Sequence, residues 1–340
     1  MRTSLGVAYR PTDWDSVIGQ DTVTLILKKQ LMDETFKNCY IFSGVSGCGK
    51  TTAARIFANE INEHQGLPIE IDAASNNGVD NVRTIIEGAK ERSLDSTYKI
   101  YIIDEAHMLT TAAWNALLKT IEEPPRYTIF IFCTTDPQKI PDTIKNRCMR
   151  FNFTRIPQYQ ITERLKFICN SEGYTNYNET CDYIGRICKG EMRNAISILE
   201  KCADISENLS IDNVFSAIGT YSYTNMFSLI NSIIDGDIGK SLKMVSDIYS
   251  EGVDLKHFIN VFLDFILDCN VYCLTEDIST TKIPTNKEKD LKYTTGINDA
   301  SNYFVYFADK LLELKNMLKN DDDPLSTIKV VVIQMCRLVK

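Results

Sequence analysis

Short apolar runs alternate with amphipathic stretches along the first half of the chain. Four runs have the β-branched and aromatic content of buried strands, at residues 39–42, 67–72, 99–105 and 127–133. The stretches beside them have helical spacing, at residues 22–32, 50–62 and 110–122, and residues 75–78 look like a cap that opens a further helix running to about Arg92. Because strands and helices alternate, the pattern predicts an α/β fold in which helices cover both faces of a parallel sheet.

From Pro157 onward the strand-like runs stop and only helical spacing remains. Helices are predicted at residues 158–172, 177–188, 191–204 and 211–217, and after Gly219 at residues 223–235, 238–250, 254–274, 297–318 and 324–338. The polar stretch at residues 276–290 is predicted to be a loop. An apolar stripe that includes Phe258, Phe262 and Phe265 indicates a core helix, with a subunit contact as the alternative.

Length and composition limit the class of protein. A chain of 340 residues exceeds what one hydrophobic core usually supports, so we expect two or three domains. No apolar run reaches the roughly 18 residues of a membrane span, and the first residues lack an apolar signal segment. We therefore expect a cytoplasmic protein that has no membrane partner.

Cysteine spacing and charge distribution limit the kinds of binding site that can be expected. The eleven cysteines contain no C-x-x-C pair, which argues against a zinc ribbon and favours small buried residues with free thiols. The net charge of −8 is uneven, because residues 1–157 hold 18 Lys and Arg against 19 Asp and Glu, whereas residues 158–340 hold 19 against 26. A phosphate-binding face is therefore expected only locally, on the first half.

One glycine-rich segment follows the first predicted strand and opens the next helix. It matches the phosphate-binding pattern G-x-x-x-x-G-K-[ST], and its residues are Gly44, Val45, Ser46, Gly47, Cys48, Gly49, Lys50 and Thr51, followed by Thr52. The glycines let backbone N–H groups turn toward a triphosphate at the helix N-terminus. Lys50 is expected to reach the β- and γ-phosphates, and the Thr51 hydroxyl to hold Mg²⁺. The alternative is a glycine-rich turn that binds no nucleotide.

Polar residues also end two later strands. Asp104 and Glu105 close the third apolar run, where one carboxylate can help to hold Mg²⁺ and the other can polarise the attacking water. Thr135 follows the fourth run, within reach of a γ-phosphate or that water. Ligands of parallel sheets lie at the carboxyl ends of strands, where all these residues are expected. Two acids at a strand end can also simply cap the next helix.

Four longer strings carry a resemblance to a known family. They are EIDAAS at residues 70–75, DEAHML at 104–109, NALLKTIEEPP at 115–125 and TTDPQKIP at 134–141. Together they resemble the ATPase motor subunit of DNA polymerase clamp loaders, above all the bacterial gamma/tau type, with the replication-factor-C small subunits next. The strong motifs lie between residues 9 and 150, and a weaker match continues to about residue 217.

The resemblance implies an AAA+ subunit of three parts: a nucleotide-binding core at residues 1–157, an all-α lid at 158–220, and an all-α collar at 221–340 that holds a five-subunit ring. It makes Arg147, in the string NRC, the arginine finger that reaches a neighbour's ATP. Arg193, in GEMRNA, becomes the lid residue that contacts the γ-phosphate in cis. Without the resemblance, either arginine is a solvated surface charge. Further implied nucleotide contacts are Arg10, Pro11, Val17 and Ile18.

The implied activity is ATP-driven loading of a sliding clamp onto primer-template DNA, with Lys50, Asp104, Glu105, Thr135, Arg147 and Arg193 as the catalytic set and ATP and Mg²⁺ as cofactors. Helix N-termini would grip DNA phosphates, and the candidates there are Asn76, Asn77, Arg83, Thr110 and Thr111. One alternative is a branch-migration or fork-remodelling AAA+ ATPase, but the strings at 115–125 and 134–141 resemble the clamp loader instead. The other alternative is a clamp loader subunit that does not hydrolyse ATP, but the P-loop and the carboxylates are intact.

The chain departs from the gamma/tau pattern in two places. About ten residues separate the P-loop helix from the next strand, and none is a cysteine, so we expect the family's four-cysteine zinc module to be absent. We also expect no C-terminal segment that tethers polymerase and helicase. Asn146 stands where the family has serine, a mild change that is not expected to disturb Arg147.

Overall fold

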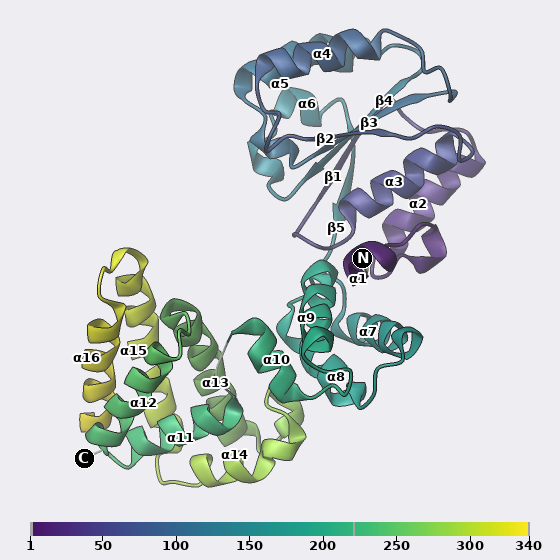
Figure 1. Ribbon diagram of the computed structural model, residues 1–340. Coiled ribbons are helices and arrows are strands. Elements are labelled where there is room, and N and C mark those ends of the chain that lie inside the picture. Colours follow the sequence, from purple (N-terminus) through teal and green to yellow (C-terminus); the bar gives the residue numbers. More distant parts are fainter. Residues whose placement is uncertain (1–2, 220–221, 339–340) are drawn as a thin grey trace. The chain divides into compact units, whose positions relative to one another are not determined.

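The computed structural model describes residues 3–219 and 222–338, and the chain divides into two compact units. The first comprises Met1–Ile168 and Cys188–Ser197, and the second comprises Cys169–Ile187 and Ile198–Lys340. Figure 1 labels the elements of both units, which are described separately below.

A parallel sheet of five strands forms the centre of the first unit, in the order β2-β3-β4-β1-β5 (Figure 1). The strands are β1 (Cys39–Gly44), β2 (Ile69–Asp72), β3 (Lys99–Asp104), β4 (Thr128–Thr134) and β5 (Met149–Phe153). The α/β fold with a parallel sheet is therefore confirmed. The sequence analysis missed β5, a short edge strand in which exposed Arg150 and Asn152 alternate with buried Phe151 and Phe153.

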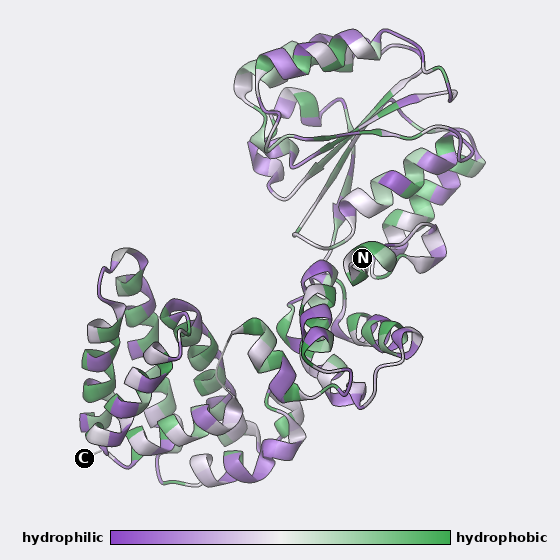
Figure 2. Cartoon of the chain, in the orientation of Figure 1, coloured by the Kyte–Doolittle hydropathy of each residue, from purple (hydrophilic) through white to green (hydrophobic). Residues whose placement is uncertain are grey.

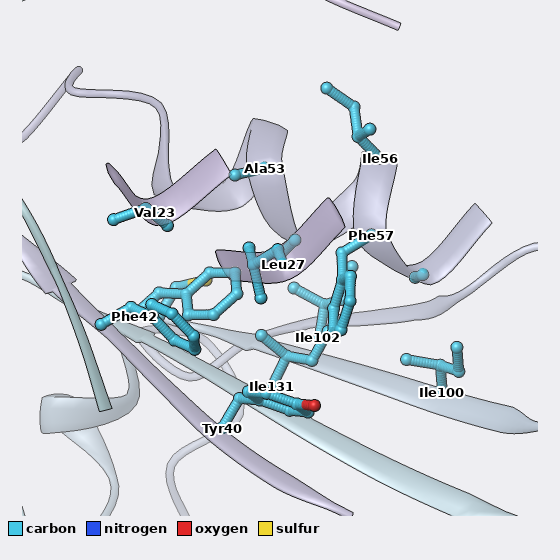
Figure 3. Close-up of a cluster of buried hydrophobic side chains, with 14 of the residues drawn as sticks. Val23, Leu27, Tyr40, Phe42, Ala53, Ile56, Phe57, Ile100, Ile102 and Ile131 are labelled. Carbon is cyan, nitrogen blue, oxygen red and sulfur yellow. The ribbon is translucent and has the colours of Figure 1, made fainter. Parts of the chain in front are cut away.

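Both faces of the sheet are buried, because alternate residues of each strand point to opposite sides. On one face Tyr40, Phe42, Ile102 and Ile131 pack with α2 and α3, as Figure 3 shows. On the other face, Ile41, Tyr101, Ile103, Phe130 and Phe132 pack with α4, α5 and α6. Apolar side chains on both faces explain why the strands are continuous apolar runs in the sequence and why they are mostly green in Figure 2.

The helices of the first unit follow the sequence pattern, with short turns added. They are α1 (Leu5–Ala8), α2 (Asp21–Met32), α3 (Lys50–Ile61), α4 (Val79–Ala89), α5 (Thr111–Glu122) and α6 (Asp142–Lys145), with the 3₁₀ turns η1 (Trp14–Ser16), η2 (Ala106–Met108) and η3 (Pro137–Lys139). Helix α7 (Gln158–Glu172) begins in this unit. The segment predicted to cap this helix, residues 75–78, does precede α4: Gly78 is the N-cap, and the Ser75 hydroxyl and the Asn76 amide bond back to Asp72. The helix ends at Ala89, three residues before the predicted end.

All the regular elements in the described residues of the second unit are helices, apart from an isolated parallel bridge between Thr175 and Asn208. The unit contains α8 (Tyr177–Ile187), most of α9 (Met192–Ile205), α10 (Ile211–Ile218), α11 (Tyr223–Ile234), α12 (Ile238–Ser250), α13 (Leu255–Thr275), α14 (Glu288–Thr295), α15 (Ala300–Met317) and α16 (Pro324–Leu338), with the turns η4 (Ile278–Thr280), η5 (Thr285–Lys287) and η6 (Leu318–Asn320). The predicted loop at 276–290 is partly wrong, because it contains two 3₁₀ turns and the start of α14. Buried Ile283 and Leu291 anchor this segment to the core.

Helix α13 packs against α14, α15 and α16. Phe258, Phe262 and Phe265 are buried in it, as predicted for a core helix. Among the described residues, it is also the one helix that is long and apolar enough to cross a membrane by length and composition, a test that core helices of soluble proteins also pass.

Two cysteines of the first unit differ from the expectation. Cys39 at the start of β1 and Cys148 just before β5 form a disulfide, whose Cα atoms are 4.7 Å apart. The expectation of free thiols is therefore wrong for this pair. Neighbouring parallel strands bring together two residues that are 109 positions apart, which no local spacing reveals.

Candidate nucleotide-binding site

The P-loop joins β1 to α3 at the carboxyl edge of the sheet. Gly49 has φ of 100° and occupies the N-cap of α3, a left-handed conformation that glycine adopts without cost. A Cβ at Gly44 would lie 2.3 Å from the Phe153 carbonyl oxygen, so β1 and β5 require glycine there. Ser46 at the tip is exposed, whereas Cys48 is buried. The segment has the shape of a backbone cradle whose N–H groups can receive an anion.

Lys50 lies within this loop. Its side chain is 6% exposed, and Nζ donates to the Gly44 oxygen at 3.0 Å and the Val45 oxygen at 2.8 Å. The two carbonyls fix the ammonium group at the mouth of the loop and leave it a third proton for a ligand.

Thr51 and Asp104 come together from separate elements. The Thr51 hydroxyl donates to Asp104 Oδ2 at 2.8 Å, and Asp104 Oδ1 accepts from the Glu105 N–H at 3.0 Å. This pair of oxygen groups beside a phosphate cradle fits Mg²⁺, which takes one or two protein oxygens and otherwise phosphates and water. Within residues 3–219 and 222–338, no group of three or more His, Cys, Asp or Glu side chains is placed to hold a metal by itself.

Glu105 is held by its neighbours in a special conformation. Its φ is 46°, in the left-handed region that side chains rarely adopt. The Thr135 hydroxyl donates to Glu105 Oε2 at 3.1 Å, and His107 Nδ1 lies 3.3 Å from the same oxygen. The ends of β3 and β4 thus bring Glu105 and Thr135 into contact.

Two arginines lie near the P-loop. A Cβ at Gly47 would be 3.3 Å from Arg193 Cβ, and the Met192 N–H donates to the Gly47 oxygen at 3.1 Å, so the start of α9 contacts the loop directly. Partial burial, followed by repulsion from Arg55, lowers the pKa of Arg10, and the charges of Arg193 and Asp104 also act on it. Arg10 therefore lies close enough to Arg193 and Asp104 for their charges to act on it.

The remaining nucleotide candidates lie in the N-terminal segment and the first turn of α3. Pro11, Val17, Ile18 and Thr52 are half-buried. Val17 also packs against the cluster that α2 and α3 form with the sheet. These side chains offer apolar and hydroxyl surface but no charge.

Arg147 is placed differently from the other candidates. Its guanidinium pairs with Glu122 Oε1 at 2.7 Å and donates to the Thr143 carbonyl at 2.7 Å. Arg147 is exposed, and its contacts are with α5 and α6.

The DNA candidates lie around two helix N-termini. The Thr110 N–H donates to the Asn77 carbonyl at 3.2 Å, which joins the starts of α4 and α5. Thr110 caps α5 by accepting from the Ala113 N–H, and Thr111 is the first residue of that helix. Arg83 pairs with exposed Asp80 at 3.0 Å, and Asn76 is turned toward Asp72.

Sequence reasoning missed two side chains that contact this site. His107 touches Glu105, and the string DEAHML contains it, although nothing in the spacing gives it a task. Gln20 is buried and bonds to the Cys48 carbonyl at 3.2 Å. A glutamine 28 positions away from its partner leaves no pattern in the sequence.

Comparison with known proteins relates both halves of the chain to one replicative polymerase. Residues 67–157 match the family model described as DNA polymerase III, delta subunit, and residues 209–339 match the model of domain III of its gamma and tau subunits.

Individual relatives agree with these models. The tau subunit of DNA polymerase III from Bacillus subtilis is 37% identical over 78% of this chain and 51% of its own length. The gamma/tau subunit from Mycoplasma genitalium is 31% identical over 96% of this chain and 58% of its own length. The chain thus spans about half the length of the relatives it matches.

Among solved structures, the RuvB Holliday junction branch migration motor of Thermotoga maritima aligns with a TM-score of 0.52 and 19% identity, over 66% of this chain and 79% of that one. At that identity the likeness concerns the fold alone, a parallel α/β core followed by helices. The matches to family models and to individual relatives are more specific, and they show that the chain belongs to the DNA polymerase III gamma/tau family.

Proposed function

We propose that this chain is the ATPase subunit of a sliding-clamp loader. In this proposal a five-subunit ring in the cytoplasm opens a polymerase clamp when ATP is bound, places it on primer-template DNA, and releases it after hydrolysis. The observation that carries the proposal is the contact of Thr51 with Asp104 beside Lys50, in a chain of the gamma/tau family.

The chemistry assigns one task to each residue of the site. Backbone N–H groups of the P-loop and Lys50 would bind the phosphates, and Thr51 and Asp104 would hold Mg²⁺. When bound, Mg²⁺ would neutralise charge on the β- and γ-phosphates. Glu105 would orient and polarise the attacking water, while Thr135 and Arg193 would contact the γ-phosphate or that water.

Arg147 would act on the ATP of the neighbouring subunit. Its exposure and its pairing with Glu122 rather than with the P-loop agree with a role in trans. An arginine supplied this way is worth about 10³ to 10⁵ in rate, so hydrolysis would depend on assembly. We further propose the division into a core at 1–157, a lid at 158–220 and a collar at 221–340, which the domain III match at 209–339 supports.

DNA would be gripped where α4 and α5 begin together. Backbone N–H groups at these N-termini, with Asn76, Asn77, Arg83, Thr110 and Thr111, would bind phosphates without reading sequence.

The test compares Glu105→Gln with the unmodified chain in the assembled ring. Glutamine keeps an oxygen for the Thr135 hydroxyl but cannot act as a base, so we expect ATP binding to persist and turnover to fall by about 10² to 10⁴. Exposed Glu63→Gln, at the end of α3, is the matched control. Hydrolysis by Glu105→Gln at the unmodified rate would remove Glu105 from the mechanism.

The same assay separates the alternatives. A clamp loader is stimulated by clamp and primed DNA together, whereas a branch-migration ATPase responds to a four-way junction. A subunit that does not hydrolyse ATP gives no turnover with either substrate.

A further inference from the structure

The side chain of Gln20 connects the P-loop to the segment that follows β5. It is 5% exposed and lies at the N-cap of α2, where it makes no capping bond. Its Nε2 donates to the Cys48 carbonyl at 3.2 Å and to the Thr154 carbonyl at 2.8 Å, and its Oε1 accepts from the Thr154 N–H at 3.1 Å. The Gln20 amide thus makes both hydrogen bonds with the Thr154 backbone, as a residue of a neighbouring strand would. Its second N–H proton bonds to the P-loop at Cys48.

The same segment continues to Arg193 through two more hydrogen bonds. The Ile156 N–H donates to the Gly190 carbonyl at 3.2 Å. Gly190, three residues before Arg193, is thus hydrogen-bonded to the segment that Gln20 also binds. The Met192 N–H then donates to the Gly47 carbonyl at 3.1 Å. Gly47 and Cys48, two successive P-loop carbonyls, are each held by one end of this connection.

Close packing makes the connection stiff. Gly19 has φ of +73°, and a Cβ there would lie 3.1 Å from Ile156 Cγ2 and 3.2 Å from Ile156 Cα. The turn before Gln20 therefore lies directly against the segment, and a shift of either one displaces the other.

The orientation of the carbonyls explains why such a connection matters. A P-loop binds phosphate by turning successive N–H groups inward, so the carbonyls that Lys50 does not bind need other donors. Gln20 and the Met192 N–H supply donors at two neighbouring carbonyls. If phosphate binding changes the shape of the loop, these bonds would carry the change to the start of α9.

We propose that Gln20 is a positioning residue that links the shape of the P-loop to the placement of Arg193, and so sets how strongly the chain prefers ATP over ADP. The inference rests on the proposed function, because it requires nucleotide in the P-loop and Arg193 at the γ-phosphate.

The test uses Gln20→Met, which keeps the length of the side chain but removes its donor and acceptor. The control is Gln30→Met, because Gln30 is also buried on α2 but bonds to Tyr40 and Met149. Affinities for ADP and for the non-hydrolysable ATP analogue AMP-PNP are measured on each purified chain with Mg²⁺. We expect Gln20→Met to lower the preference for AMP-PNP about tenfold, a change of about 1.4 kcal/mol, whereas Gln30→Met leaves the preference unchanged.

A double variant separates positioning from general damage. Adding Gln20→Met to Arg193→Ala should lower the preference no further than Arg193→Ala alone, because both changes remove the same interaction. Equal weakening of both nucleotides by Gln20→Met, or full additivity with Arg193→Ala, would overturn the proposal. If Arg193→Ala itself leaves the preference intact, the proposed role of Arg193 fails and the inference fails with it.

A second test measures hydrogen exchange in the unmodified chain, so its result does not depend on whether a variant folds. We expect the amides of Ile156 and Met192 to exchange more slowly with AMP-PNP than with ADP. Equal protection by the two nucleotides at both amides contradicts the connection.

Discussion

The two compact units use buried polar groups in opposite ways. In the first, Lys50, Thr51 and Asp104 lie at the carboxyl edge of a sheet, where hydrogen bonds fix them but leave them able to meet a ligand. In the second, Asp268 is 9% exposed and accepts from the Lys282 N–H at 3.2 Å, and the Tyr223 hydroxyl donates to the Lys282 carbonyl at 3.3 Å. These bonds join helices to the segment before α14. Similar residue types thus form a site open to a ligand in the first unit, whereas in the second unit they hold two helices to the segment at Lys282.

Lys50→Ala should give the largest effect and should act only on the first unit. The triphosphate would lose the one cation that the P-loop holds inside it, and the loss of a single preorganised donor costs about 10² or more in turnover. Nucleotide binding and ATP hydrolysis are measured beside exposed Lys37→Ala. Unchanged turnover in Lys50→Ala would mean that the open site does not bind phosphate.

Asp268→Asn should alter stability and leave nucleotide binding unchanged. Burial raises the pKa of Asp268 to about 6, although Lys282 and Arg186 oppose the shift. Because the folded pKa lies above the unfolded value of 3.8, the folded state binds its proton more tightly. Stability is then fully present below the unfolded value and is lost as the pH rises through about 6.

Asparagine carries no proton that is lost as the pH rises, so its contribution to stability does not change with pH. We therefore expect the free energy of unfolding of Asp268→Asn to exceed that of the unmodified chain by roughly 2 to 3 kcal/mol at pH 7, and not to exceed it at pH 3.5. Urea unfolding at the two pH values measures the difference, with exposed Asp247→Asn as the control. A variant that is less stable at both pH values would show that the ionised form of Asp268, and not its protonated form, stabilises the contact with Lys282.

Arg83→Ala should give the smallest effect. If Arg83 meets one DNA phosphate, binding of primed DNA weakens a few-fold and the slope of log affinity against log salt falls by about one. The control is Lys90→Ala, at the opposite end of α4. Equal slopes for both variants would place the DNA contact away from the N-terminus of α4.

The difference between the units also explains what the sequence could predict. P-loop geometry needs glycine at fixed places, and acids at strand ends must follow apolar runs, so Gly44, Asp104 and Glu105 leave a readable pattern. Long helices such as α12 and α13 were predicted within a residue, because one face of each is buried. The unpredicted features depend on distant partners: β5 needs a neighbouring strand, Gln20 needs Cys48 and Thr154, and Cys39 needs Cys148.

The helix α14 was missed for a related reason. Its residues are mostly polar, and the few that are buried, Leu291 and Thr294, are anchored by the core of the second unit. A short polar helix of this kind is stabilised by tertiary packing and has little local signal.

The most direct test of the central claim, that Arg147 completes the ATP site of a neighbouring copy, mixes two inactive variants. Arg147→Ala keeps an intact P-loop and Lys50→Ala keeps an intact Arg147, so mixed rings contain some interfaces with both groups. We expect ATP hydrolysis stimulated by clamp and primed DNA to be higher in the mixture than with either variant alone. If mixed rings form, as mass measurement can establish, and their hydrolysis exceeds neither variant, Arg147 does not act in trans.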